Sequence, residues 1–343
     1  MSAPTLTAAA RIDPRRLVWL FGTIGLTAAA FAVTIAMAPA VTEQPVQALG
    51  WLLFVGSSVH VASTGWFYAV PEVRVHMAAH RLRYVVVPLA LVAGTAGVAA
   101  AIPEHAFTWL LLGFFAWQFF HFQKQNLGMA ALAGISTGAG SVSRAERRAL
   151  VAAGLAGTAG LLVHPELLQL TVDAHVRYLF PATAAVFLLA VLVGTVLIAR
   201  RRRGKRPPAF VLVYVLSLLF FAPVFLFTSP YAAVAGLTLA HGFQYLLIVG
   251  LVADARSVTR SPLTVAGRRV ISLLVLVNVA LIGGLALNAA SHLHSGGPAA
   301  RAVYGAYLGI VMAHFVIDAG LWRLRDEFPR TFLRDSLPYL LAR

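Results

Sequence analysis

Long apolar stretches alternate with short polar segments along the whole chain. The stretches show no strict alternation of apolar and polar residues, so they do not have the pattern of half-buried strands. As α-helices, stretches of about 20 residues are long enough to cross the hydrocarbon core of a bilayer. The pattern therefore predicts an all-α, polytopic transmembrane helical bundle, with residues 1–343 forming a single integral membrane domain.

We expect about ten spans, each roughly 20 residues long. The first span resembles a signal peptide, because Arg15 and Arg16 precede it and a small-residue motif at 38–40 ends it. Its apolar part exceeds the roughly 7–15 residues of a signal peptide, so we expect an uncleaved span. The predicted spans cover residues 16–39, 46–70, 84–102, 106–127, 148–164, 178–199, 208–228, 231–253, 270–290 and 302–322.

Charge follows the same segmentation, with 27 Lys and Arg residues against 12 Asp and Glu residues. Basic residues gather in every second loop, as in the run 200–206, whereas the loops around 103–105 and 228–230 are nearly uncharged. The positive-inside rule then puts the basic loops and both termini on the cytoplasmic side of the cell membrane. The bilayer is the expected partner of these charges, with attraction to anionic headgroups and no nucleic acid.

The amino-acid composition excludes a soluble domain and several kinds of cofactor site. Only 11% of the residues are charged and 59% are hydrophobic, whereas soluble domains carry roughly 25% charged residues. The chain has no cysteine, which excludes disulfides, iron–sulfur clusters, thiolate-bound metals and covalently attached c-type haem.

Polar residues inside spans are costly, so we looked for function among them. Four of the eleven histidines lie in predicted spans: His60, His121, His241 and His314. Each is about 10 to 15 residues into a span that runs from outside to inside, so all four lie within roughly 8 Å of one another in depth. We predict that these four histidines bind a metal ion.

Each histidine has polar neighbours at helical spacing. Asp318 follows His314 by one turn and is the one carboxylate well inside a predicted span; we predict that it is catalytic or a direct ligand. Gln118, Gln125 and Gln244 are predicted to support the cofactor by orienting the imidazoles, and Ser57 and Thr64 flank His60. The competing interpretations are interhelical hydrogen bonds for the histidines, for Gln118 and for Gln244, and an ion pair with Arg323 or Arg325 for Asp318. Aromatic residues at the same depth, Tyr245 among them, are interpreted as packing.

The intramembrane histidines and the stretch His314–Phe315–x–x–Asp318 resemble the Brp/Blh family of membrane β-carotene dioxygenases. The resemblance implies a polytopic protein that holds a non-haem iron and acts on a substrate dissolved in the membrane. The chain lacks that family's early His-Gly-Ala-x-Asp element and has more spans. The resemblance therefore supports a metal site more than it supports carotenoid cleavage.

Three function classes follow from these residues, beside a purely structural or assembly role. The first is a non-haem iron oxidoreductase, with copper or zinc as alternative metals, acting on a lipophilic small molecule such as a carotenoid, a quinone or a fatty acyl chain. The second is a b-type haem protein with paired axial histidines. The third is a proton-coupled transporter that uses the intramembrane His and Asp residues as a relay. A weaker candidate site is the His76–x–x–x–His80 pair in a predicted cytoplasmic loop.

Overall fold

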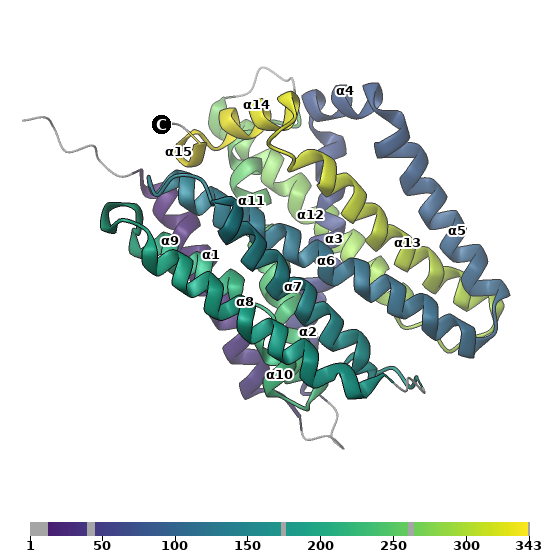
Figure 1. Ribbon diagram of the computed structural model, residues 1–343. Helices are drawn as coiled ribbons and strands as arrows, with labels where there is room; N and C mark the ends of the chain where they lie inside the picture. Colours follow the sequence, from purple (N-terminus) through teal and green to yellow (C-terminus); the bar gives the residue numbers. More distant parts are fainter. Residues whose placement is uncertain (1–12, 40–44, 173–175, 260–263, 342–343) are drawn as a thin grey trace, which may run out of the picture.

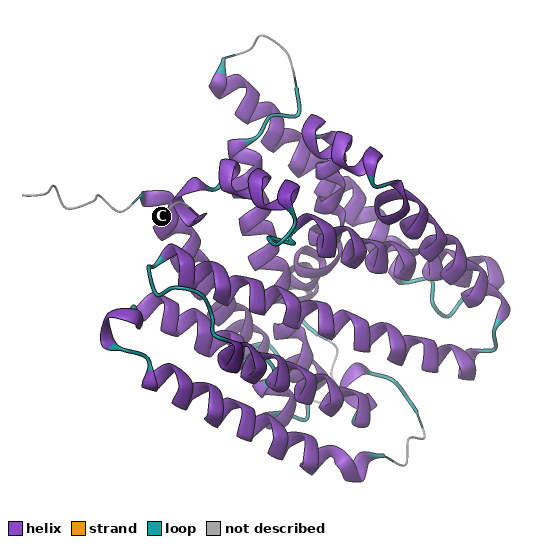
Figure 2. Ribbon diagram, turned by 45° about the horizontal axis from the view of Figure 1, so that its top comes forward, coloured by secondary structure: helices purple, strands orange, loops and turns teal. Residues whose placement is uncertain are grey.

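The structure is a computed structural model that describes residues 13–39, 45–172, 176–259 and 264–341. It is 84% helical, and the described residues contain no strand. The helices run across the molecule side by side in one tilted bundle (Figure 1), and short loops join them (Figure 2). The predicted all-α class is confirmed.

Within the described residues, seven helical segments are long and apolar enough to cross a membrane. In five of the seven segments less than half of the best window is buried, with as little as 17% for Leu82–Ala101, against 56% for Pro298–Leu321 and 72% for Tyr231–Ala255. Outward-facing apolar surface on this scale needs lipid as its solvent. The segments are α1 (Pro14–Ala36), Gln47–Ala69 with α2 (Gln47–Phe54) and α3 (His60–Ser63), Leu82–Ala101 with α5 (Val87–Ala101), Arg177–Arg200 with α8 (Phe180–Arg200), Tyr231–Ala255 with α11 (Gly236–Ala255), α12 (Val265–Ser291) and α13 (Pro298–Leu321).

The three remaining predicted spans have different outcomes. Spans 106–127 and 148–164 coincide with helices, α6 (Glu104–Ser136) and α7 (Arg144–Val163), that are not among the seven. The predicted span 208–228 is interrupted, because α9 (Pro208–Leu218) ends before α10 (Ala222–Leu226) begins. Pro223 explains the break: it has no N–H to donate to the carbonyl of residue 219, and its ring fits only the first turn of a helix.

Three short helices gather at one end of the bundle (Figure 1): α4 (Pro71–Ala79), α14 (Glu327–Ser336) and α15 (Pro338–Leu341). Arg256, just after α11, reaches α14 by donating to Ser336 Oγ and to the Phe332 carbonyl. The start of α1 lies at the same end, where Arg15 pairs with Asp254 at 3.2 Å. The first and last described helices therefore meet on one face, and the tail predicted only as extramembrane is helical.

A close backbone approach brings two histidine-bearing segments together. The π-helical turn Val55–Val59 directly precedes His60, and Gly242 directly follows His241. A Cβ added to Gly242 would collide with the Gly56 carbonyl oxygen, so the two backbones touch without intervening side chains. Small residues allow this approach between helices in lipid, and here it draws the side chains of His60 and His241 into contact.

An ion pair fixes the loops at the basic end of the bundle. Arg201 donates to both carboxylate oxygens of Glu146 at 2.5 Å, while the Ser143 amide donates to the same carboxylate at 2.7 Å. Burial raises the pKa of the Glu146 carboxyl, but the hydrogen bonds from Arg201 and from the Ser143 amide outweigh burial and hold the pKa below its usual range. The ionised pair therefore stabilises the fold at neutral pH.

We expect Glu146→Gln to destabilise the protein, because Arg201 would be left partly buried without its partner. Breaking a buried pair costs about 3–5 kcal/mol, so the melting temperature in detergent should fall by about 5–10 °C at pH 7. The Glu146 contribution is present above the unfolded pKa of about 4.3 and is lost as the pH falls through the lower folded pKa, so the difference between wild type and variant should shrink in acid. The exposed Glu166–Arg177 pair offers the control: Glu166→Gln should change the melting temperature by less than about 2 °C. Equal losses in both variants would contradict the prediction.

Candidate metal centre

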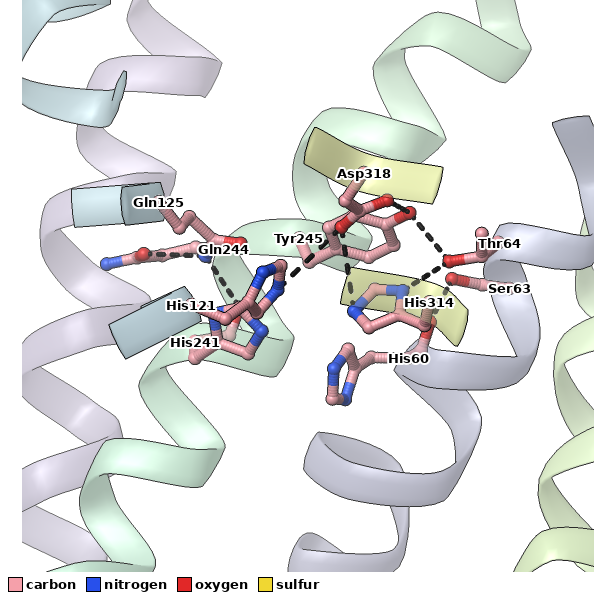
Figure 3. A network of polar contacts seen from close by, with 10 residues as sticks. All are labelled: His60, Ser63, Thr64, His121, Gln125, His241, Gln244, Tyr245, His314 and Asp318. Carbon is pink, nitrogen blue, oxygen red and sulfur yellow. Dashed lines mark hydrogen bonds and ion pairs between the residues drawn. The ribbon is translucent and has the colours of Figure 1, made fainter. Parts of the chain in front are cut away.

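The four predicted histidines converge in the middle of the bundle (Figure 3). His60 comes from α3, His121 from α6, His241 from α11 and His314 from α13. The ring centroid of His60 lies 5.0 Å from that of His241 and 5.2 Å from that of His314, and the His121 ring lies at the same two distances from these two rings. Segments up to 254 residues apart in sequence thus meet at one point, as their similar depth predicted.

Their ligand atoms form two overlapping groups. His60, His241 and His314 each offer a ring nitrogen within 4.8 Å of the others, and so do His121 and His314 together with an Asp318 oxygen. Asp318 Oδ2 lies 3.5 Å from Nε2 of His314 and 3.9 Å from Nε2 of His121. The predicted neighbour Asp318 therefore belongs to the cluster, and His314 is the member that both groups share.

A second polar layer lies on one side of the histidines. Each of its members follows a histidine by four residues, which is one helical turn, and so lies on the same face of its helix. The members are Thr64 after His60, Gln125 after His121, Tyr245 after His241 and Asp318 after His314. Hydrogen bonds join three of them, because Tyr245 donates to Asp318 Oδ1 at 2.8 Å and its hydroxyl lies 2.8 Å from Thr64 Oγ1.

This chain of hydroxyls continues to His314, whose Nδ1 lies 2.7 Å from Thr64 Oγ1. A hydroxyl has one proton to donate. With Asp318 ionised, Tyr245 gives its proton to the carboxylate, Thr64 donates to Tyr245, and His314 must donate Nδ1–H to Thr64. The lone pair of neutral His314 is then on Nε2, which faces the Asp318 carboxylate and the other histidines (Figure 3).

The cluster has more ligand atoms than hydrogen-bond partners. Both ring nitrogens of His60 and of His241, and Nε2 of His121 and of His314, are buried and have no hydrogen-bond partner among the described residues. His60, His241, His314 and Asp318 are each at most 4% exposed, and the side chain of His121 is 10% exposed. Burying polar groups without a partner costs about 1–3 kcal/mol for each group. A bound cation would satisfy several of these atoms at once, and four imidazoles with one carboxylate are a donor set that suits iron, copper or zinc.

None of the three glutamines makes a hydrogen bond to an imidazole nitrogen among the described residues; for Gln244 this agrees with the competing interpretation of an interhelical hydrogen bond. Gln125 donates to the His241 backbone carbonyl at 2.9 Å and to Gln244 Oε1 at 3.0 Å, and Gln244 donates to Thr27 of α1 at 2.7 Å. They hold the helices of the cluster together and do not orient an imidazole through its ring nitrogen. Gln118 is half-buried and lines a small cavity next to His60.

The structure also changes the interpretation of Tyr245 and gives no support for an ion pair between Asp318 and a described arginine. Arg323 pairs with Asp326 at 3.5 Å, and no arginine among the described residues pairs with Asp318. Tyr245, interpreted as packing, is buried but also donates the hydrogen bond that orders the Asp318 carboxylate. Its position four residues after His241 puts Tyr245 on the same helix face as that histidine, and this spacing could have identified its role. The aromatic side chain instead led to the interpretation as packing.

The His76–His80 pair is separate from this centre. The two rings lie 4.4 Å apart at the end of α4, and the His76 ring stacks on Phe328 of α14 with centroids 4.0 Å apart. No third metal-ligating side chain of the described residues joins them. Burial, His80 and Arg83 lower the pKa of His76, which keeps the ring neutral and suits its stacked position.

No family model, curated protein or solved structure matches this chain. The functional argument therefore rests on the geometry of the site.

Proposed function

We propose that the protein is an integral membrane metalloprotein whose histidine cluster holds a non-haem metal ion, and that it acts as an oxidoreductase on a lipophilic substrate. The observation that carries the proposal is the convergence of four buried imidazoles, six of whose ring nitrogens have no hydrogen-bond partner among the described residues. Hydrogen-bonding glue between helices would pair those nitrogens with donors or acceptors on neighbouring helices. Here the neighbours are other ligand atoms.

The membrane arrangement belongs to the proposal as well. We propose ten spans, with α6, α7 and the broken α9–α10 segment added to the seven apolar ones, in the cell membrane with both termini in the cytoplasm. The polar face of α6 supports its inclusion, because His121 and Gln125 of that helix point into the bundle and away from lipid. The Arg-rich loops supply the orientation through the positive-inside rule.

Iron is the metal we favour, with copper and zinc as alternatives. Imidazole and carboxylate ligands suit iron, and the resemblance to membrane dioxygenases with intramembrane histidines supports the same choice. Haem b is disfavoured, because the neighbouring histidine rings are only 5.0–5.2 Å apart and the cavity beside them measures about 30 Å³, far less than a macrocycle needs.

Each residue of the site has a separate role in this proposal. His60, His121, His241 and His314 would hold the ion, and Asp318 would add negative charge beside Nε2 of His314. An iron ion in such a site supplies one-electron chemistry and activation of dioxygen. Tyr245 and Thr64 would keep Asp318 and His314 in their orientations, and Asp318 is the group placed to hold a proton during turnover. The site is buried among membrane helices, so a substrate that partitions into lipid has the shortest route to it.

The test is the metal content of the purified protein by elemental mass spectrometry. We expect about one iron, copper or zinc ion per chain in the wild type, as for other buried sites with three or more protein ligands. The His76→Ala/His80→Ala variant is the matched control for adventitious binding and should keep this content. A folded wild-type protein without metal would refute the proposal and favour the proton relay, because Asp318, Tyr245, Thr64 and His314 form one hydrogen-bonded chain.

Asp318→Asn separates a ligand or charge role from a packing role. The amide has the same shape but no negative charge, so metal affinity should fall by about 10–100-fold while the helical content is unchanged. Metal titration of the stripped protein, followed by circular dichroism of the same samples, measures both quantities. Wild-type affinity in this variant would remove Asp318 from the site.

A further inference from the structure

A small chamber lies on the side of the histidines opposite to Asp318. It measures about 30 Å³, and its lining includes Ser57, Gln118, Thr238 and Val311. Each of these four residues precedes one of the four histidines by three positions, so the chamber is the layer one helical turn away from them. The Asp318, Tyr245, Thr64 and Gln125 layer lies four positions after the histidines. The histidine layer is thus between a hydrogen-bonded layer and a hollow one.

Among the four histidines, His60 is the one that lines the chamber. Phe122 stacks on the His241 ring with centroids 4.1 Å apart, and Phe315 stacks on the His121 ring at 4.5 Å. These two phenylalanines also line the chamber, so they separate it from His241 and His121. The way from the chamber to the ligand atoms therefore passes His60, neither of whose ring nitrogens has a hydrogen-bond partner in the described part of the chain.

The polar side chains of the chamber leave hydrogen-bonding capacity for a guest. Ser57 uses its hydroxyl on the Leu53 carbonyl at 2.6 Å, but the Gln118 amide makes no hydrogen bond to any of the described residues. A water molecule needs roughly 10–15 Å³ of such volume, so the chamber suits two water molecules or one molecule of two or three heavy atoms. A carotenoid, quinone ring or acyl chain does not fit this volume.

We propose that this chamber binds the small exogenous ligand of the metal centre, such as a water, a hydroxide or a small anion, and that Gln118 donates the hydrogen bond that positions it. This inference rests on the proposed metal site. In this scheme two molecules reach the metal centre by different routes. The small ligand comes from the chamber and passes His60, whereas the lipophilic substrate comes from outside the chamber. Gln118 is a positioning residue in this scheme, and the predicted role of supporting the cofactor is replaced by one toward the guest.

The probe is azide, a linear anion of three heavy atoms, and the reporter is copper(II) loaded at one equivalent. Azide bound to copper gives a charge-transfer absorption that is absent without direct coordination, so the readout does not depend on turnover. Metal content is measured on the same samples. We expect saturable azide binding in the wild type, and Gln118→Leu should weaken it by about five- to tenfold through loss of one hydrogen bond.

Thr238→Leu tests the volume, because the larger side chain would fill the chamber from α11. Azide binding should weaken by at least about tenfold while the copper content stays at the wild-type level. Asn278→Leu is the matched control, since Asn278 is an exposed amide on α12 whose side chain bonds only to the Leu274 carbonyl within its own helix. It should leave azide affinity unchanged.

The outcomes separate the two proposals. Copper retained by the wild type without an azide signal, or equal azide affinity in wild type and Thr238→Leu, would overturn the chamber as the ligand site and leave the metal site standing. A wild-type protein that takes up no copper, iron or zinc would overturn the metal site, and the chamber proposal with it. Weaker azide binding in both chamber variants at constant copper content supports the proposal.

Discussion

His314→Ala should abolish metal binding, taking the metal content from about one ion per chain to less than about a tenth of that. His314 is the one residue shared by both groups of ligand atoms, so its loss leaves each group with two ligands. It is also the histidine whose Nε2 lies nearest to the Asp318 carboxylate, at 3.5 Å. The variant therefore removes the ligand that connects the two groups and leaves the Asp318 carboxylate beside His121 alone, at 3.9 Å. Elemental analysis of purified protein, with gel filtration to show an intact bundle, measures the effect.

Two further variants make this result specific. His292→Ala changes an exposed histidine just after α12 and should retain the wild-type metal content. His60→Ala should also lose metal, because His60 belongs to the group formed with His241 and His314. Full metal content in both His314→Ala and His60→Ala would mean that the cluster is not the site, even if the protein is found to carry a metal.

The all-α class of the fold was predictable because few backbone structures can satisfy all their hydrogen bonds in lipid. Runs of about 20 apolar residues must satisfy their backbone hydrogen bonds internally. Most of the helices that result begin and end close to the predicted limits, but α6 continues to Ser136, beyond the predicted end at residue 127. The segment 208–228 is broken at Pro223, and although this proline is visible in the sequence, hydropathy alone does not decide whether it kinks a helix or ends it. Hydropathy reports solubility in lipid and is insensitive to a single residue without an N–H.

The membership of the cluster was also predictable, because depth in a membrane follows from residue count. Four histidines at similar depth, on helices expected to run in the same direction, needed only suitable rotations to meet. The roles of the glutamines were not predictable, because a rotation of about 100° per residue decides whether an amide faces the metal site, a backbone carbonyl or a cavity. Gln125 reaches the His241 carbonyl and Gln118 reaches the chamber, although both lie one turn from the same histidine.

The layering explains why one side of the histidines is hydrogen-bonded and the other hollow. The side with Asp318 has side chains with complementary donors and acceptors, which close a chain through Tyr245 and Thr64. The other side presents Val311, two stacked phenylalanines and small hydroxyl side chains, whose volumes leave a gap. The two sides of the histidine layer therefore differ in polarity and in packing.

Thr64→Val should weaken metal binding by about 10–100-fold, although Thr64 is not a ligand. The valine has nearly the same shape but cannot accept the Nδ1–H of His314, so nothing holds the tautomer that puts the lone pair on Nε2. The neighbouring Ser63→Ala is the matched control, because Ser63 is equally buried and donates only to the His60 backbone carbonyl at 2.6 Å. Its metal affinity should stay within about threefold of the wild type, which corresponds to roughly 0.7 kcal/mol.

A double-mutant cycle distinguishes this tautomer effect from a general loosening of the site. Tyr245→Phe breaks the same chain at its next hydroxyl, so the Thr64→Val/Tyr245→Phe protein should bind metal about as weakly as the poorer single variant. Residues that act independently would instead multiply their effects. Metal dissociation constants for the four proteins, measured by competition with a chelator, decide the question: multiplicative losses would show that Thr64 and Tyr245 do not act through one hydrogen-bonded chain to His314.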